Sequence, residues 1–349
     1  MKMIKTAEAC DQKKRSFLKL SGLLGLGAAS TALFSVDKAE AVLFGRNEYK
    51  VSRTRTAMGT YVSITAIHSS RDQAEQAIGL AFDEIDRLTA LLSRYDAASM
   101  VSLLNDNGAL EFDSSEVVEL VSRSLYYHKQ TNGAFDITVK PLVDLYKQRF
   151  AAGLKPSEAE ITAELAKIGS EYIRIENGRI SFTRPEMGIT LDGIAKGFIV
   201  DRISSLLAQQ GITNHLINAG GDIRTNGAAA GNKPWTVAIQ DPAKQKQYPA
   251  VIKMTNGAIA TSGNYEIFYD KERMFHHIVD SHTGHSPLLA TSVTVKAASV
   301  MDADALATSV FVMEPSEGVS FINRQPYCEC FVVRQNGVTM QSKGWKAFG

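Results

Sequence analysis

Cysteine is rare in this 349-residue chain, which has three copies. Cys10 lies in the N-terminal segment, and Cys328 and Cys330 stand two residues apart in a strand-like run, PYCECFVV. A disulfide at that spacing would be strained, so we expect two thiols in the core or at a sheet edge. The spacing also fits no common zinc motif, which excludes a cysteine-based metal site.

An excess of charge of either sign is also missing, since the formal net charge is +1. Residues 1–41 contain seven Lys or Arg and four Asp or Glu, so the remaining chain has 31 basic and 33 acidic residues. Nothing in this balance indicates a nucleic acid partner. With 44% hydrophobic and 21% charged residues, the composition is typical of a soluble globular protein with a full core.

Long apolar runs are absent except for one near the N-terminus. Residues 13–34, KKRSFLKLSGLLGLGAASTALF, have a basic start and a short apolar stretch, and AEA follows at residues 39–41. This pattern predicts a signal peptide over residues 1–41 with cleavage near Ala41. KRSFLK resembles a twin-arginine export signal with Lys in place of the first Arg. We expect export to the periplasm; the general secretory route, an uncleaved anchor and association with the inner membrane stay open.

Helical and strand-like segments interleave through residues 45–349 without a clean linker or an internal repeat. Residues 71–92, 115–130, 195–211 and 302–313 have helical patterns. The expected strands are residues 54–67, 214–219, 235–240, 258–263, 276–280, 291–297 and 328–333. The interleaving predicts one catalytic domain of mixed α/β or α+β class.

Two glycine-rich stretches could approach a ligand. In GITLDGIAKGFIVD, Gly193 and Gly197 flank a predicted strand-to-helix junction, where free N–H groups and Lys196 would suit a phosphate. In INAGGDIRTNG, a glycine pair precedes Asp222, which could face a ligand. The alternatives are an ordinary helix start with an exposed lysine and a plain hairpin turn.

Four of the seven histidines gather in HHIVDSHTGHSP, residues 276–287, together with Asp280. Their spacing fits no common zinc site, so one histidine acting as a general base or a phosphate contact is the better functional interpretation. The alternative is a polar loop after a strand.

Two carboxylates open the apolar segment MDADALATSVFVM, residues 301–313. On a helix, Asp304 and Thr308 are four residues apart and share a face. A carboxylate and a hydroxyl, with a carbonyl from elsewhere, form the hard oxygen site that Mg²⁺ prefers. The alternative is a helix N-cap role for Asp302 or Asp304.

These stretches occur in one order with TAMGT, SRYDAASMVSLLN, GAFDITVKPLV, WTVAIQDP and AIATSGNYE between residues 54 and 313. In that set and order the sequence resembles the ApbE family, the FAD:protein FMN transferases. The resemblance implies an α+β, T-fold-like catalytic domain with FAD in a cleft. It also implies a Mg²⁺-dependent reaction that transfers the FMN moiety of FAD to a Ser or Thr hydroxyl of a target protein and releases AMP.

The resemblance assigns roles to individual residues. It implies metal ligands at the side chains of Asp304 and Thr308 and at main-chain oxygens of Ala195 and Ala307, with Asp302 as an N-cap or a support. His277 is expected nearest the reacting hydroxyl, and either His277 or Asp280 removes the proton. The implied FAD contacts are Met58, Tyr95, Ala134, Phe135, Asp136, Asp192, Lys196, Phe198 and Ile278.

The resemblance also implies protein partners. Such enzymes modify an S/T-G-A-S/T type sequence in exported or outward-facing flavoproteins, such as subunits of sodium-pumping NADH:quinone reductase and FMN-binding-domain reductases. This chain has no obvious acceptor motif of its own, so the target should be another protein. Two alternatives use the same scaffold: a Mg²⁺-dependent FAD pyrophosphatase that gives FMN and AMP, and a non-enzymatic flavin-binding protein.

Overall fold

The computed structural model describes the backbone of residues 40–44 and residues 48–111, 115–240, 248–265, 268–270 and 274–346. Residues 1–39, which contain most of the predicted export signal, lie outside the described residues, and Glu40 and Ala41 begin strand β1. None of the helices in the described part is long and apolar enough to span a membrane.

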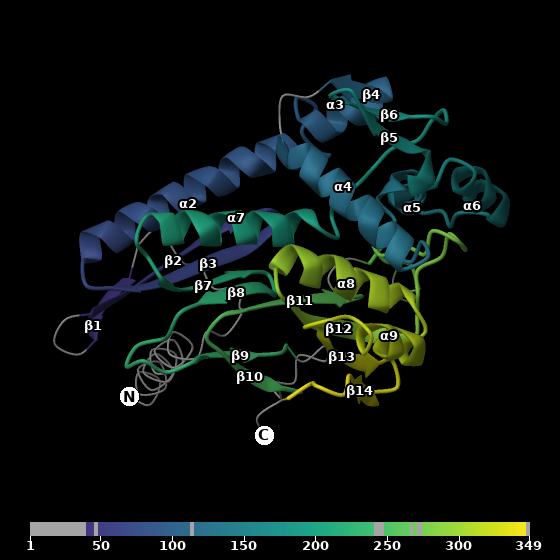
Figure 1. Cartoon of the computed structure of the whole chain (residues 1–349). Coiled ribbons are helices and arrows are strands. Elements are labelled where there is room, and N and C mark those ends of the chain that lie inside the picture. Colours follow the sequence, from purple (N-terminus) through teal and green to yellow (C-terminus); the bar gives the residue numbers. More distant parts are fainter. Residues whose placement is uncertain are drawn as a thin grey trace, which may run out of the picture.

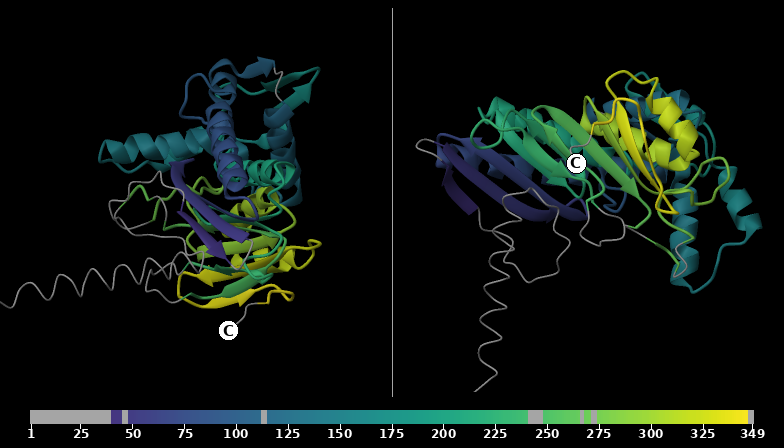
Figure 2. Two further views of the ribbon diagram at one scale, coloured as in Figure 1. Left: turned by 90° about the vertical axis from the view of Figure 1, so that its left-hand side faces the viewer. Right: turned by 90° about the horizontal axis from the view of Figure 1, so that it is seen from below.

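A nine-stranded sheet forms the centre of the molecule, and its neighbouring strands pair antiparallel. The strands follow one another across it from purple to yellow (Figure 2). In pairing order they are β1 (Glu40–Phe44), β2 (Glu48–Ala57), β3 (Thr60–His68), β7 (Asn214–Ala219), β8 (Asp222–Asn226), β11 (Gly257–Gly263), β12 (Ala290–Ala297), β13 (Glu329–Arg334) and β14 (Thr339–Gln341).

Residues 54–67 form parts of two strands, so the prediction of one strand there was wrong. Met58 and Gly59 make a two-residue turn between β2 and β3, with φ of 51° and 72°. Positive φ at both central residues matches the right-handed twist of a hairpin, and Met58 adopts it without being glycine. The sequence concealed the turn because Met58, a non-glycine residue, occupies its first central position.

Three helices cover one face of the sheet (Figure 1): α2 (Arg71–Leu92), α7 (Ala195–Gln209) and α8 (Val300–Val312). The helix predicted over 71–92 is confirmed; Ser70 caps it by accepting a hydrogen bond from the N–H of Gln73. Its buried residues recur every three or four positions, from Ala74 to Leu92, and pack with α7, α8 and the sheet into the main core.

The opposite face of the sheet carries a smaller hydrophobic cluster. A two-stranded ribbon, β9 (Trp235–Ala238) and β10 (Val251–Met254), lies there (Figure 1). Trp235 and Ile252 from this ribbon join residues of β3, β7, β8 and β11 in the cluster. Hydrophobic side chains therefore pack on both faces of the central sheet.

The remaining elements pack beside the helices. They are α3 (Met100–Asn107), β4 (Ala109–Glu111), α4 (Ser115–Gln130), η1 (Ile137–Val139), α5 (Lys140–Ala151), α6 (Glu158–Leu165), η2 (Ser170–Tyr172), β5 (Ile173–Glu176), β6 (Arg179–Phe182) and α9 (Pro315–Ile322). Cys328 and Cys330 are free thiols as predicted, and burial raises the pKa of Cys328 to about 11 and that of Cys330 to about 12.

Candidate functional site

Two tight turns meet at one end of the central sheet. Besides the turn at Met58 and Gly59, Gly220 and Gly221 connect β7 to β8 with φ of 64° and 108°. A Cβ on Gly220 would lie 2.5 Å from Oγ1 of Thr60, so the second turn fits against the first only with glycine there. The glycine pair is thus a hairpin turn, and it places Asp222 at this end of the sheet.

Helix α8 directs Asp304 and Thr308 toward this end of the sheet. The helix begins at the N-cap Ser299, whose Oγ accepts the N–H of Asp302 at 3.1 Å. Asp304 is 4% exposed, and its Oδ2 accepts a hydrogen bond from the N–H of Gly197 at 3.2 Å. Oγ1 of Thr308 lies 3.2 Å from Oγ of Ser262 on β11. The predicted i, i+4 pair therefore reaches two other elements from one side of α8.

The loop before α7 approaches Thr308 closely at Gly193. A Cβ on Gly193 would lie 3.0 Å from Oγ1 of Thr308 and 3.4 Å from Cε2 of Phe135. The N–H of Ala195, the first residue of α7, donates to the carbonyl of Leu191 at 2.8 Å and closes a turn there. Gly193 thus lets the loop before α7, α8 and the loop of Phe135 approach one another closely.

The oxygen groups at this point fit a hard cation by their chemistry. Asp304 contributes a carboxylate, and Thr308 and Ser262 contribute hydroxyls, the donor types that Mg²⁺ prefers. Among the described residues, no group of three or more His, Cys, Asp or Glu side chains could hold a metal ion. A cation here would therefore need hydroxyl or backbone oxygens, such as those of Ala195 and Ala307. Ala307 lies inside α8, where a carbonyl normally accepts an intrahelical bond.

Lys196 and Asp222 form an ion pair beside this cluster. Nζ of Lys196 lies 3.0 Å from Oδ2 of Asp222, whose side chain is 1% exposed. Among the described residues this oxygen has no well-aligned hydrogen-bond donor, so the contact is chiefly electrostatic. The pair fixes the lysine at the first turn of α7, where backbone N–H groups also favour an anion.

An exposed aromatic ring on the loop after α2 stacks on a buried arginine. The ring of Tyr95 is 68% exposed, and the guanidinium carbon of Arg94 lies 4.6 Å from its centroid. The Arg94 side chain is 5% exposed and donates to Asp144 at 2.9 Å and to Asp192 at 3.2 Å. Tyr95 thus offers a planar face to a ring ligand, and Asp192 uses its carboxylate to anchor the arginine.

The carboxylate of Asp136, one of the predicted FAD contacts, is already bound by groups of the protein. It accepts hydrogen bonds from the N–H of Thr138 at 2.7 Å and from Oγ of Ser170 at 2.7 Å, and Nδ1 of His128 lies 3.1 Å away. Burial favours a higher pKa for Asp136, but the bonds from His128, Thr138 and Ser170 outweigh it and lower the pKa. Asp136 therefore anchors this loop through its side chain.

Residues 276–280, predicted as a strand, are not one; only an isolated bridge pairs Phe268 with His276. His276 is fully buried with Nε2 2.8 Å from the carbonyl of Pro287, and burial lowers its pKa. His277 is half-buried beside it. Oγ of Ser286 accepts the N–H of His276 and donates to the carbonyl of His276, so side-chain hydrogen bonds take the place of a β-ladder here.

The loop after His277 is organised by Asp280. Its carboxylate accepts hydrogen bonds from the N–H of His282 and from Oγ1 of Thr283, each at 2.9 Å. Oγ of Ser281 donates to the carbonyl of Gly133 at 2.8 Å, which ties this loop to the loop of Ala134 and Asp136. Gly133 and Ser281, which are 148 residues apart in the sequence, thus lie side by side.

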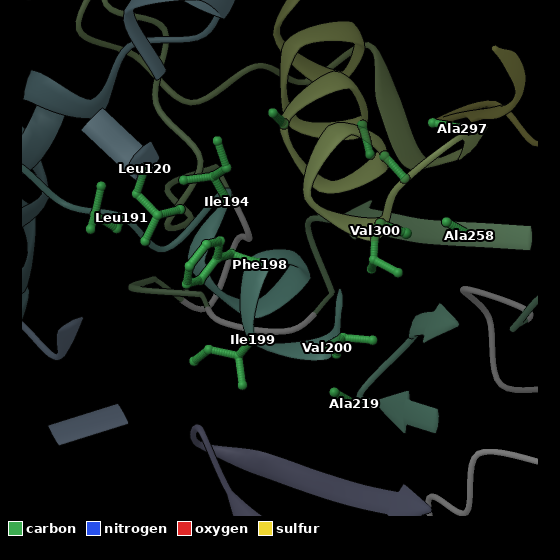
Figure 3. Close-up of a cluster of buried hydrophobic side chains, with 14 of the residues drawn as sticks. Leu120, Leu191, Ile194, Phe198, Ile199, Val200, Ala219, Ala258, Ala297 and Val300 are labelled. Atoms are coloured by element: carbon green, nitrogen blue, oxygen red, sulfur yellow. The ribbon is translucent and has the colours of Figure 1, made fainter. Parts of the chain in front are cut away.

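Three of the predicted flavin contacts are largely core residues. Phe198 is 2% exposed, Phe135 is 3% exposed and Ile278 is 6% exposed. Figure 3 shows Phe198 between Ile194 and Ile199 in the cluster that joins α7 to its neighbours. Their side chains support the site from beneath, and contact with a ligand would fall chiefly to their backbone.

Asp302 is not the N-cap of α8, since Ser299 takes that role. Its Oδ1 accepts hydrogen bonds from Nε and Nη2 of Arg123 at 2.9 and 2.6 Å and from the hydroxyl of Tyr127 at 2.7 Å. Asp302 therefore ties α8 to α4. The sequence hid this because Arg123 is about 180 residues distant.

Sequence reasoning also missed Ser262 and Arg94. Ser262 lies in AIATSG, a run of small residues with two hydroxyls, which could have signalled a close approach to a ligand. Arg94 precedes Tyr95 directly, and only its ion pairs with Asp144 and Asp192 reveal its positioning role.

The sequence is similar to those of known proteins. Residues 58–332 match the sequence pattern of the ApbE family. The chain belongs to the ApbE family. A protein of Vibrio cholerae serotype O1 named FAD:protein FMN transferase is 34% identical over 249 residues, which cover 68% of this chain and 74% of the relative.

Solved ApbE structures share the fold. The ApbE protein of Thermotoga maritima superimposes with a TM-score of 0.78 at 29% identity, covering 84% of this chain and 97% of that one. The flavin transferase ApbE from Vibrio cholerae gives a TM-score of 0.72 at 28% identity, covering 88% and 98%. The predicted ApbE-like α+β domain is confirmed.

Proposed function

We propose that this protein transfers the FMN moiety of FAD to a Ser or Thr hydroxyl of target proteins and releases AMP. Membership of the ApbE family over most of the chain is the observation that carries the proposal. The convergence of Asp304, Thr308 and the Gly193 loop supports it, because transfer at phosphorus needs neutralised charge and an aligned nucleophile.

In the proposed reaction, the acceptor oxygen attacks the phosphorus on the FMN side of the pyrophosphate. A new O–P bond forms, the P–O bond to the AMP phosphate breaks, and its electron pair leaves with AMP. The hydroxyl proton passes to a base, for which His277 is the better candidate. Asp280, the other candidate, already accepts two hydrogen bonds from its own loop.

We propose a Mg²⁺ site at the side chains of Asp304 and Thr308 and the main-chain oxygens of Ala195 and Ala307. When bound, the cation would neutralise charge on the pyrophosphate. Lys196 would add positive charge from the first turn of α7, held there by Asp222. The donor set supports this assignment because every group in it is a hard oxygen.

The flavin and adenine rings of FAD would contact Met58 and the exposed face of Tyr95. Asp192 would position Arg94 beneath that face. The backbone of Ala134, Phe135 and Asp136 would border the ligand, with Phe198 and Ile278 supporting it from the core. An aromatic face can stack on a planar ring and add affinity without hydrogen bonds to that ring.

The proposed targets are flavoproteins with an S/T-G-A-S/T sequence, such as subunits of sodium-pumping NADH:quinone reductase and FMN-binding-domain reductases. The basic and apolar pattern of residues 13–34 supports export to the periplasm, where such targets would meet the enzyme. Covalent attachment would keep the flavin from diffusing away outside the cytoplasm.

The test is the intact mass of an acceptor fragment with an S/T-G-A-T site after incubation with residues 42–349, FAD and Mg²⁺. The proposal predicts a gain of one FMN unit that disappears when a chelator is added or when the acceptor Thr is changed to Ala. Free FMN and AMP without a gain in mass would instead indicate the pyrophosphatase. FAD binding with neither product would indicate a flavin-binding protein.

A further inference from the structure

Helices α7 and α8 exchange hydrogen bonds through two carboxylates. The N–H of Gly197 in α7 donates to Oδ2 of Asp304 in α8 at 3.2 Å. In return, the N–H of Met301 in α8 donates to Oδ2 of Asp201 in α7 at 2.9 Å. Gly197 and Asp201 are four residues apart, so both lie on the face of α7 that meets α8.

The two helices are unusually close where this exchange occurs. A Cβ on Gly197 would lie 2.4 Å from the carbonyl oxygen of Val300, so any larger residue would force the backbones apart. Arg224 on β8 supports the contact: its Nη1 donates to the carbonyl of Ala298 at 2.7 Å and lies 3.6 Å from Oδ1 of Asp201. Arg224 of the sheet therefore positions Asp201, and Asp201 in turn binds the first turn of α8.

Asp201 is not needed merely to cap the N-terminus of α8. Ser299 already caps the helix from within its own chain segment, and Asp302 ties it to α4. What Asp201 adds is a direct link between the first turn of α8 and the helix that begins at Ala195. That link fixes the distance between Asp304 and the start of α7.

We propose that Asp201 is a positioning residue that holds the carboxylate of Asp304 in register with the backbone of Ala195, so that both reach one cation. The inference rests on the cation site proposed above. Supporting groups of this kind change metal affinity by roughly 10–100-fold when they are removed. Loss of Asp201 removes one of the two hydrogen bonds that hold Asp304 and the first turn of α8 against α7.

The test is the binding of Mn²⁺ to the full domain in the presence of FAD, followed by electron paramagnetic resonance of the free ion. Asp201→Ala should weaken Mn²⁺ binding about 10-fold or more. Asp201→Asn keeps an accepting oxygen but makes a weaker hydrogen bond than a carboxylate, so it should weaken binding by roughly two- to five-fold. Transfer at saturating cation should recover in both variants.

The matched control is Ser299→Ala, which removes one cap of the same helix end without breaking the link to α7. It should lower Tm about as much as Asp201→Ala while leaving Mn²⁺ binding within about two-fold of the wild type. Equal weakening by Ser299→Ala, or wild-type binding by Asp201→Ala, would overturn the inference. If Asp201→Ala is insoluble, wild-type binding by Asp201→Asn would overturn it.

A second control separates this inference from the proposed cation site. Asp304→Asn should abolish the tight binding of Mn²⁺. Equal Mn²⁺ binding by the wild type and Asp304→Asn would overturn the site itself, and the role of Asp201 with it. Loss of binding in Asp304→Asn together with wild-type binding in Asp201→Ala would leave the site standing and overturn only the role of Asp201.

Discussion

The α4-facing and α7-facing sides of α8 each have one carboxylate, and the two differ in their surroundings. Asp302 is occupied by the side chains of Arg123 and Tyr127. Asp304, two residues later, receives a backbone N–H from Gly197 and lies near the hydroxyl cluster of Thr308 and Ser262. A carboxylate surrounded by cationic and phenolic donors stabilises the fold, whereas one among hard oxygens can hold a cation.

The largest expected effect is on the α7-facing side. Asp304→Asn keeps the shape of the side chain but removes its charge, so we expect FMN transfer to fall by on the order of 10²–10³-fold. The rate of AMP release, followed by chromatography, measures this. Loss of less than about tenfold would place the catalytic cation elsewhere.

The close approach of α7 and α8 can be broken at Gly197. Gly197→Ala sets a methyl group against the carbonyl oxygen of Val300, so we expect a loss of about 1–3 kcal/mol in the free energy of unfolding. Urea denaturation measures it. Gly79→Ala in α2 is the matched control: a Cβ there meets nothing within 4 Å, and the change should stabilise by about 0.5–1 kcal/mol. Destabilisation of equal size in both would contradict this account of the contact.

The carboxylate of Asp136 resembles that of Asp302 on the α4-facing side of α8, because side chains of the protein occupy both. The bond to Asp136 raises the pKa of His128. The folded state then binds the proton more tightly, so this stabilisation is complete below the unfolded-state pKa of about 6.5 and is lost as pH rises through the raised folded-state pKa. His128→Gln should cost about 1–2 kcal/mol near pH 6 and less at high pH.

Thermal denaturation at several pH values measures the effect of His128→Gln. His285→Gln, at a position whose side chain is 44% exposed, is the control and should show a smaller difference. A His128→Gln difference that grows as pH rises would contradict the assigned direction of the pKa.

The smallest expected effect concerns the exposed ring of Tyr95. Tyr95→Leu should weaken FAD binding by about 3–10-fold, because the loss of an aromatic stack is worth roughly 0.5–1.5 kcal/mol. Tm should stay unchanged, since the side chain is 68% exposed. Tyr126→Leu is the control, because Tyr126 is also exposed beside an arginine but lies on α4. Isothermal titration with FAD measures both; equal weakening would refute a specific stack.

The sequence predicted local features more reliably than distant partners. The helix over 71–92 and the shared face of Asp304 and Thr308 follow from periodicity within a few turns. The Met58 turn was missed because a non-glycine residue adopts a positive φ there, and the 276–280 strand was wrong because side-chain bonds replace a ladder.

Partners across the chain decided the roles that the sequence left open. The role of Asp302 depends on Arg123, and the role of Asp192 depends on Arg94, and neither partner is marked by spacing. Phe198 belongs to a helical pattern that cannot tell a core ring from a ligand contact, and only burial separates the two. Long-range packing therefore distinguishes structural residues from ligand contacts where local sequence patterns do not.

The most direct test of the central claim compares Asp302→Asn with Asp304→Asn on one acceptor fragment, with intact mass for transfer and thermal denaturation for stability. We expect Asp302→Asn to have a lower Tm yet transfer FMN within about tenfold of the wild type, because it loses a charged hydrogen bond worth roughly 1.5–3 kcal/mol. We expect Asp304→Asn to remain folded and transfer almost none. Loss of transfer in Asp302→Asn at temperatures where it is folded, or retained transfer in Asp304→Asn, would contradict the assignment.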